Sequence, residues 1–310
     1  MASPRHLDLL ALLALSLIWG SAFALIKIAV AEVTPLTMAA GRIALAAVVL
    51  LAVQAVVGPP LRILWTAPRL WLPFLVLGML GNGIPFVLIG YGETRIDSGL
   101  AALLIGTMPL STIVLAAAFG VERGLGARAW AGIALGFAGL VLLLGPATGG
   151  DWLSGDGDMI VAQLAVVLGG ASYAATAVYG RVVSLRLPVA VVAAGSMVAS
   201  ALVMTPLVLI IDQPWQASPG APAILAIVTL GLVATALASL IYFRLLRTAG
   251  PTFVSLVNYL IPALGYALGI LWLGESANWR EIAALALILS ALTLVRRRPA
   301  AIVASGEAKP

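Results

Sequence analysis

The chain has 310 residues, of which 62% are hydrophobic and only 9% are charged. A soluble globular domain carries about 25% charged residues, so this composition excludes an ordinary soluble enzyme and a disordered chain. It indicates a polytopic membrane protein, and the 32 glycines and 18 prolines agree with a bundle of membrane helices. Cysteine is absent, which excludes a disulfide framework, a thiolate metal site and a cysteine nucleophile.

Ten apolar runs are long enough to cross a membrane, because a hydrocarbon core of about 30 Å requires roughly 20 apolar residues per helix. The runs cover residues 8–30, 35–57, 70–90, 97–119, 127–145, 159–180, 188–211, 222–243, 251–273 and 279–296. They are too long and too continuously apolar for the alternating pattern of a membrane β-barrel. We therefore expect a single all-α membrane domain over residues 1–310, with ten transmembrane helices and no soluble domain.

The basic residues predict the orientation of these helices. If the N-terminus is cytoplasmic, Arg95 and Arg280 fall outside, and most other basic residues fall on the cytoplasmic side, as the positive-inside rule requires. The cytoplasmic set is Arg5, Arg62, Arg69, Arg123, Arg128, Arg181, Arg186, Arg244, Arg247, Arg296, Arg297, Arg298 and Lys309. Both termini are thus predicted to be cytoplasmic. The net charge of +5 is a topology signal, so the expected partners are the lipid bilayer and a small-molecule substrate, with no nucleic acid.

The chain resembles itself at an offset of 153 residues. The matched positions are Pro35 with Pro188, Leu77-Gly78 with Leu230-Gly231, Asn82 with Thr235, Pro109 with Pro262, and Glu122 with Glu275. One shared offset for these landmarks predicts two five-helix halves, approximately residues 7–146 and 157–298. Because five is an odd number, the second half starts on the opposite side of the membrane, and the repeats are inverted. Inverted repeats are typical of secondary transporters that expose one midplane site to each side in turn, so we expect alternating access.

Several of these features also occur in a known family. They are the ten spans, the two halves, Trp19-Gly20-Ser21 in the first span, Arg42 in the second, and Pro109 with Glu122 repeated as Pro262 with Glu275. Together they resemble the drug/metabolite transporter superfamily, and in particular its EamA-type ten-helix exporters. The resemblance implies a bacterial inner-membrane carrier that exports small metabolites, such as aromatic and other neutral amino acids, from the cytoplasm. Arg42 departs from the repeat, because it aligns with Gly195 or Ser196 in the second half.

Helix breaks and polar residues inside the spans are candidates for a central cavity. Pro85 follows Asn82 in the third span, and Pro109 and Pro262 interrupt the fourth and ninth, so these prolines are predicted hinges or gates. A packing kink is the alternative for Pro85.

The predicted substrate-binding residues are Trp19, Ser21, Asn82, Met108, Ser111, Tyr173, Ser255, Asn258, Tyr259 and Tyr266. The last four share one face of the ninth span. Aromatic walls with a few polar groups suit small zwitterionic or partly apolar solutes, whereas each hydroxyl alone could serve helix packing.

Two basic residues lie within predicted spans. Lys27 is near the outer end of the first span, from which its long side chain can reach the headgroups. Arg42 is deeper, where a charge costs about 2.5–3.5 kcal/mol on insertion scales. It either orients a substrate carboxylate or holds an outer gate, or else it reaches the headgroups or pairs with Glu32 or Glu93.

The acids near the membrane fall at span ends, namely Glu32, Glu93, Asp97, Glu122 and Glu275. This placement argues against a proton-coupled multidrug antiporter and predicts transport without a pH gradient.

Other functions are weighed against these residues. An intramembrane enzyme would need buried catalytic groups, but the only histidine is His6, so we expect no catalysis, no cofactor and no metal. Efflux of drugs or organic cations is the alternative substrate class. A non-transporting scaffold or a channel is the alternative of another kind, although a channel is expected to carry charged or carbonyl-lined rings. Gly132-x-x-x-Gly136 and Gly265-x-x-x-Gly269 permit close helix contacts, so the chain is expected to be a monomer or a homodimer.

Overall fold

The computed structural model describes residues 6–57, 66–121, 126–144, 157–183 and 187–295. Within these ranges the fold is all-helical and contains no strand. Eight of the described helical stretches are long and apolar enough to cross a membrane, and Ala127–Leu143 is a shorter apolar helix. The repeat landmark Glu122 lies outside the described ranges, and so do these residues of the predicted cytoplasmic set: Arg5, Arg62, Arg123, Arg186, Arg296, Arg297, Arg298 and Lys309.

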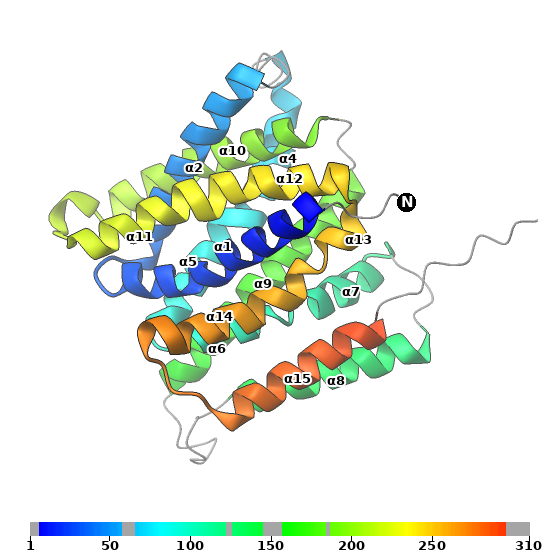
Figure 1. The fold of residues 1–310 in the computed structure, drawn as a ribbon. Coiled ribbons are helices and arrows are strands. Elements are labelled where there is room, and N and C mark those ends of the chain that lie inside the picture. Colours follow the sequence, from blue (N-terminus) through cyan, green and yellow to red (C-terminus); the bar gives the residue numbers. More distant parts are fainter. Residues whose placement is uncertain (1–5, 58–65, 122–125, 145–156, 184–186, 296–310) are drawn as a thin grey trace, which may run out of the picture.

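The helices follow one another with short connections (Figure 1). They are α1 (His6–Val30), α2 (Pro35–Val57), α4 (Trp71–Gly78), α5 (Ile84–Glu93), α6 (Ser98–Ile105), α7 (Met108–Ala118), α8 (Ala127–Leu143), α9 (Gly157–Val183), α10 (Val189–Ile211), α11 (Ala221–Gly231), α12 (Ala238–Thr248), α13 (Pro251–Val254), α14 (Val257–Leu273) and α15 (Trp279–Val295). Short 3-10 turns occupy Pro68–Leu70 and Pro214–Gln216. Proline stands in the first turn of several helices, where its missing N–H leaves no intrahelical acceptor unpaired.

Two π-helical segments interrupt the long helices at equivalent places. Met79–Gly83 joins α4 to α5, and Leu232–Leu237 joins α11 to α12. In the first segment the N–H of Ile84 donates to the carbonyl of Met79, five residues earlier. This wider turn precedes Pro85, which has no N–H of its own to donate. The two segments start 153 residues apart, at the repeat offset, and π-helical turns of this kind often mark functional sites.

Helix packing follows the same repeat. Under the 153-residue offset, α2 corresponds to α10 and α8 to α15, and each of these pairs is in contact. The contact of α1 with α14 corresponds to the contact of α9 with α7, and the contact of α5 with α9 corresponds to that of α12 with α1. In Figure 1, α8 and α15 lie side by side along one edge of the bundle. The two sets of helices therefore interlock, so that each half packs mainly on the other.

Glycine permits two of these crossings. A Cβ atom at Gly78 would lie 2.1 Å from the backbone oxygen of Ser196 in α10. A Cβ atom at Gly231, the equivalent residue, would lie 2.7 Å from the Cβ of Leu45 in α2. Each glycine immediately precedes a π-helical segment. Close backbone approach at small residues is how membrane helices pack without a hydrophobic driving force between them, so these contacts fix where the π-helical segments sit.

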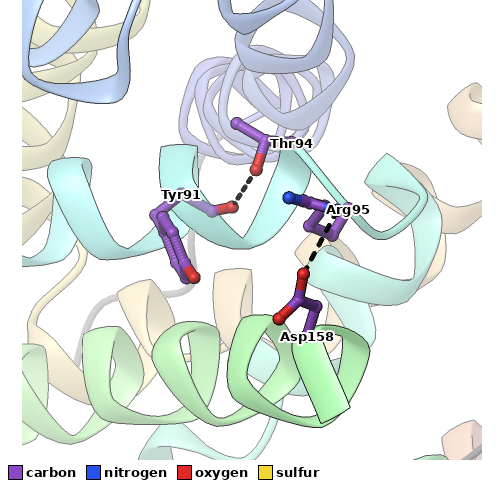
Figure 2. A network of polar contacts seen from close by, with 4 residues as sticks. All are labelled: Tyr91, Thr94, Arg95 and Asp158. Atoms are coloured by element: carbon purple, nitrogen blue, oxygen red, sulfur yellow. Dashed lines mark hydrogen bonds and ion pairs between the residues drawn. The ribbon is translucent and has the colours of Figure 1, made fainter. Parts of the chain in front are cut away.

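The loop after α5 is held by polar contacts at the surface (Figure 2). The hydroxyl of Thr94 donates to the carbonyl of Tyr91 at 2.7 Å, which closes the last turn of α5. Arg95 forms an ion pair with Asp158 at the start of α9, with 3.5 Å between the two side chains. Both side chains are more than half exposed, so this ion pair contributes little stability and serves mainly to place the loop beside α9.

Candidate functional site

A cavity of about 380 Å³ lies among helices from both halves of the chain. Its polar and aromatic lining residues are Trp19, Phe23, Arg42, Asn82, Phe86, Tyr173, Thr235, Ser239, Tyr242, Ser255 and Asn258. The remaining lining is apolar and includes Ala22, Ile26, Ile89, Met108, Leu246 and Val254. Pockets for small molecules range from about 300 to 1,000 Å³ and combine apolar walls with a few polar groups, which is the composition found here.

Several of the predicted site residues line this cavity. The predicted binding residues that do so are Trp19, Asn82, Met108, Tyr173, Ser255 and Asn258, together with Arg42 and the predicted hinges Pro109 and Pro262. They come from α1, α2, the first π-helical segment, α7, α9 and the α13–α14 region. The structure thus brings together residues that are far apart in the sequence and belong to both halves.

Other predicted residues lie away from the lining. Ser21 donates to the carbonyl of Ile18, within its own helix, and the hydroxyl of Tyr266 accepts the N–H of Asn278 at 3.0 Å. Tyr259 packs on a small apolar cluster that includes Leu110 of α7. Ser111, Pro85 and Lys27 are likewise outside the lining. Ser21 and Tyr266 thus make hydrogen bonds within the helical framework and not in the cavity.

Both π-helical segments contribute polar side chains to the lining, namely Asn82 and Thr235. The hydroxyl of Thr235 donates to the carbonyl of Leu230, five residues earlier, at 2.8 Å. The ring N–H of Trp19 donates to the carbonyl of Ala234 at 3.2 Å, and the Trp19 ring lies 5.7 Å from that of Tyr242. Backbone carbonyls in a membrane interior need hydrogen-bond partners. In the second π-helical segment, Trp19 is such a partner, and its ring is also part of the cavity wall.

Arg42 is buried in the cavity wall, with 5% of its surface exposed. Its Nε donates to the hydroxyl of Thr235 at 2.7 Å, and its guanidinium carbon lies 3.7 Å from the centre of the Phe86 ring. Stacking of a guanidinium on an aromatic face is favourable, more so when the pair is desolvated. In the described part of the chain Arg42 forms no ion pair with Glu32 or Glu93, and Glu32 instead accepts the N–H of Gly220.

A polar cluster lies in the helical turns that follow the lining residues Ile26 and Ile89. Lys27 does not extend outward there: its ammonium donates to the carbonyls of Glu93 and Ile96, at 2.9 and 2.7 Å. Glu93 is fully buried, and both of its carboxyl oxygens lack a hydrogen-bond partner among the described residues. The sequence places Glu93 correctly at the end of a helix but gives no sign of this burial.

Glu275 belongs to the same polar cluster. Its carboxylate accepts the N–H groups of Ser98 and Gly99, at 2.7 and 2.9 Å, in the first turn of α6. A carboxylate is favoured at a helix N-terminus because it satisfies free N–H groups and the helix dipole. Close by, Asp97 is partly buried, and this burial and the nearby Glu275 carboxylate raise its pKa. The sequence could not pair Glu275 with α6, because the two are more than 170 residues apart.

Within the described ranges no group of His, Asp and Glu side chains could hold a metal ion. Two matched sets of helices around a central cavity with a few polar groups are the arrangement found in many secondary transporters.

The chain belongs to the EamA-like transporter family, which matches it twice, over residues 7–145 and 160–297. It is therefore a membrane transporter of the drug/metabolite transporter superfamily, and a multi-pass inner membrane protein, as the sequence predicts.

Named relatives extend over nearly the whole chain. The uncharacterized inner membrane transporter YedA of Escherichia coli (strain K12) is 32% identical over 291 residues, which cover 92% of this chain and 89% of the relative. A probable terminal-alkyne amino-acid exporter of Streptantibioticus cattleyicolor is 27% identical over 282 residues, or 90% of each chain. A protein of known crystal structure has the same fold, with a TM-score of 0.65 at 22% identity, over 94% of this chain and 96% of that one.

Proposed function

We propose that the protein is an alternating-access secondary transporter that exports small metabolites from the cytoplasm, including aromatic and other neutral amino acids. The observation that carries this proposal is the cavity, whose wall is built from equivalent π-helical segments of the two halves. A site shared by two matched halves is what alternating access requires, because a small rearrangement of one half against the other can open either end. The amino-acid exporter among its relatives supports the substrate class.

The full topology in this proposal has ten transmembrane helices in two inverted repeats, with both termini in the cytoplasm. The eight long apolar stretches, α8 and α15 supply the ten. The symmetric helix contacts described above support the duplication. With this topology the cavity extends to Leu246 and Pro251, at the cytoplasmic ends of α12 and α13, while the Lys27 and Glu275 contacts close the outer end. The structure then corresponds to an inward-facing state.

Counterflow in liposomes tests the transport function. The purified chain, reconstituted with unlabelled amino acid inside, should take up labelled aromatic and neutral amino acids with saturable kinetics. Asn258→Ala removes an amide from the cavity lining and should reduce the rate about tenfold, the effect of one lost substrate hydrogen bond. Ser290→Ala, at an exposed position in α15, is the matched control and should leave the rate unchanged. Uptake of organic cations alone would favour drug efflux, and no uptake of any solute would favour a scaffold.

Single-cysteine labelling tests the inverted topology. Because the chain has no cysteine, each introduced cysteine is the only thiol that can be labelled. Arg95 and Arg247 are both exposed and lie at the ends of equivalent spans, one in each half. In intact cells an impermeant maleimide should label Arg95→Cys but not Arg247→Cys, and permeabilisation should expose the second. Labelling of both residues from the same side would overturn the inverted repeat and the alternating-access mechanism with it.

A further inference from the structure

Arg42 gives the cavity a charge selectivity that the second half does not share. We infer that the cavity prefers solutes that carry one carboxylate and no ammonium group, and that Arg42 is the residue that binds this carboxylate. The inference rests on the proposed transport function and narrows its substrate class. It makes deaminated, monoanionic metabolites the best ligands, with zwitterionic amino acids second and organic cations last.

The charges of the lining support this order. Arg42 is the only charged side chain among the residues that line the cavity in the described part of the chain, and no aspartate or glutamate is among them. The residues at its repeat-related position, Gly195 and Ser196, bring no second charge. The described residues that line the cavity therefore carry one positive charge and no negative charge.

The geometry holds this charge in place. Nε of Arg42 is fixed by Thr235, and the guanidinium plane is supported by the Phe86 ring, which itself lines the cavity. The remaining guanidinium N–H groups make no hydrogen bond to the described residues, so they are available to a ligand. A guanidinium with fixed orientation presents a fork of donors that matches the two oxygens of a carboxylate.

Glu93 does not neutralise this charge by direct contact. The Glu93 carboxyl and Arg42 interact electrostatically, but they form no hydrogen bond or ion pair, and Glu93 lies outside the cavity lining, one helical turn beyond Ile89. Lys27 and Glu275 also act on Glu93, with opposite signs. The face of α9 that packs against this part of α5 presents Ala162 and Val166 and brings no charge of its own.

The net charge of the loaded cavity then sets the preference. A monoanion cancels the Arg42 charge, so the loaded site is neutral. A zwitterion also pairs its carboxylate, but it leaves one positive charge in a region of low polarity, which is costly unless the ammonium finds partners. The aromatic pair Trp19 and Tyr242 offers a weak partner by cation–π contact, which is why zwitterions are placed second. A cation would add its charge to that of Arg42.

Three ligands with the same ring separate these cases: 3-phenylpropanoate is an anion, phenylalanine a zwitterion and phenethylamine a cation. Their binding to the purified full-length chain in detergent can be followed by tryptophan fluorescence or by the shift in unfolding midpoint, without any transport. We expect 3-phenylpropanoate to bind about tenfold more tightly than phenylalanine, and phenethylamine to bind most weakly.

Substitutions assign the preference to Arg42. Arg42→Gln should abolish the advantage of the anion, and Arg42→Lys should retain part of it, because the charge remains while the fork of donors is lost. Arg69→Gln, which removes an exposed arginine that is not part of the cavity lining, is the matched control and should bind as the wild type does. The ligand order in the wild type tests the inference even if Arg42→Gln fails to fold.

Each outcome of these experiments either supports or overturns one part of the inference. Equal affinities, a preference for phenylalanine or phenethylamine, or no binding of any of the three would overturn the charge selectivity. An anion preference that survives Arg42→Gln would overturn the role of Arg42. Counterflow is measured separately: binding in the expected order without counterflow would contradict the transport function and leave the binding site in place, whereas counterflow with the wrong order would contradict only the selectivity.

Discussion

Trp19 and Ser172 make equivalent hydrogen bonds in the two halves of the chain. The ring N–H of Trp19 donates to the carbonyl of Ala234 at 3.2 Å, and the hydroxyl of Ser172 donates to the carbonyl of Leu80 at 2.8 Å. The two donors are 153 residues apart, and each acceptor belongs to the π-helical segment of the opposite half. The residue types differ and the acceptors are one position apart at the repeat offset, but each π-helical segment receives a hydrogen bond from the opposite half, as a carbonyl freed in a membrane interior requires.

Removing either donor should destabilise the protein. Trp19→Phe keeps the aromatic ring and loses the N–H, and Ser172→Ala loses the hydroxyl, so each leaves one carbonyl without that partner. We expect each change to lower the free energy of unfolding by about 1 kcal/mol, the usual value for one such bond. The midpoint of thermal unfolding measures it, with Ser290→Ala as the control. Unchanged midpoints in both variants would show that these bonds are incidental.

In the proposed topology, the contact of Glu275 with Ser98 and Gly99 predicts how the outer end of the cavity opens. Glu275→Ala removes both hydrogen bonds to the first turn of α6, and loss of a helix cap costs about 0.5–2 kcal/mol. The closed end should therefore open more often. Ser98→Cys is a suitable reporter, because Ser98 is fully buried, its backbone N–H is retained and the chain has no other cysteine.

An impermeant maleimide should react with Ser98→Cys about tenfold faster in the Glu275→Ala background, in line with the loss of a cap. Asp212→Asn changes a carboxylate at the end of α10 that accepts from Thr37 and not from α6, and it should leave the labelling rate unchanged. If the two backgrounds label at equal rates, Glu275 does not hold this end closed.

Gly78 and Gly231 should tolerate no side chain. An added Cβ would clash with the backbone of Ser196 in the first case and with Leu45 in the second. Overpacking of this kind typically costs about 1–3 kcal/mol, so Gly78→Ala and Gly231→Ala should both lower the unfolding midpoint.

Gly180 in α9 is the matched control for these substitutions. Its nearest neighbour would lie 3.8 Å from an added Cβ, and alanine favours a helix over glycine, so Gly180→Ala should raise the midpoint slightly. Three equal responses would mean that the close crossings of α4 with α10 and of α11 with α2 are not tight in solution.

The sequence predicts the helical membrane domain and the family because the hydrophobic runs and the repeated landmarks are local or periodic signals. The offset that pairs Asn82 with Thr235 also pairs the two π-helical segments, so part of the cavity wall could be located from the repeat. Neither Phe86 nor Tyr242 is among the predicted residues, although Phe86 lies one turn after Asn82 and could have been found from it.

The face of the ninth span shows the limit of periodicity. Ser255 and Asn258 line the cavity, whereas Tyr259 and Tyr266 do not. Helical spacing assigns residues to a broad stripe, and which edge of that stripe meets the cavity depends on the neighbouring helices. Tyr266 is also two turns farther along α14, beside Asn278 at the closed end. The acceptors of Lys27 likewise depend on where α5 ends next to α1, which no local pattern encodes.

Glu93 gives the last prediction, because its carboxyl group is fully buried without a hydrogen-bond partner in the described part of the chain. The neighbouring ammonium of Lys27 donates to backbone carbonyls and not to this carboxyl. An ionised carboxylate without hydrogen bonds is very costly to bury, and a neutral amide of the same shape costs less. Glu93→Gln should therefore raise the unfolding midpoint, whereas Glu275→Gln, which loses part of a satisfied cap, should lower it.

The same variant tests the expectation that transport needs no pH gradient. If no carboxyl group couples transport to protons, Glu93→Gln should keep counterflow at the wild-type rate, with and without a pH difference across the liposome membrane. Loss of gradient-driven transport with retained counterflow would instead identify Glu93 as a proton-coupling group. A lower unfolding midpoint in Glu93→Gln would show that the carboxylate stabilises the closed end through Lys27, against the argument from its missing hydrogen bonds.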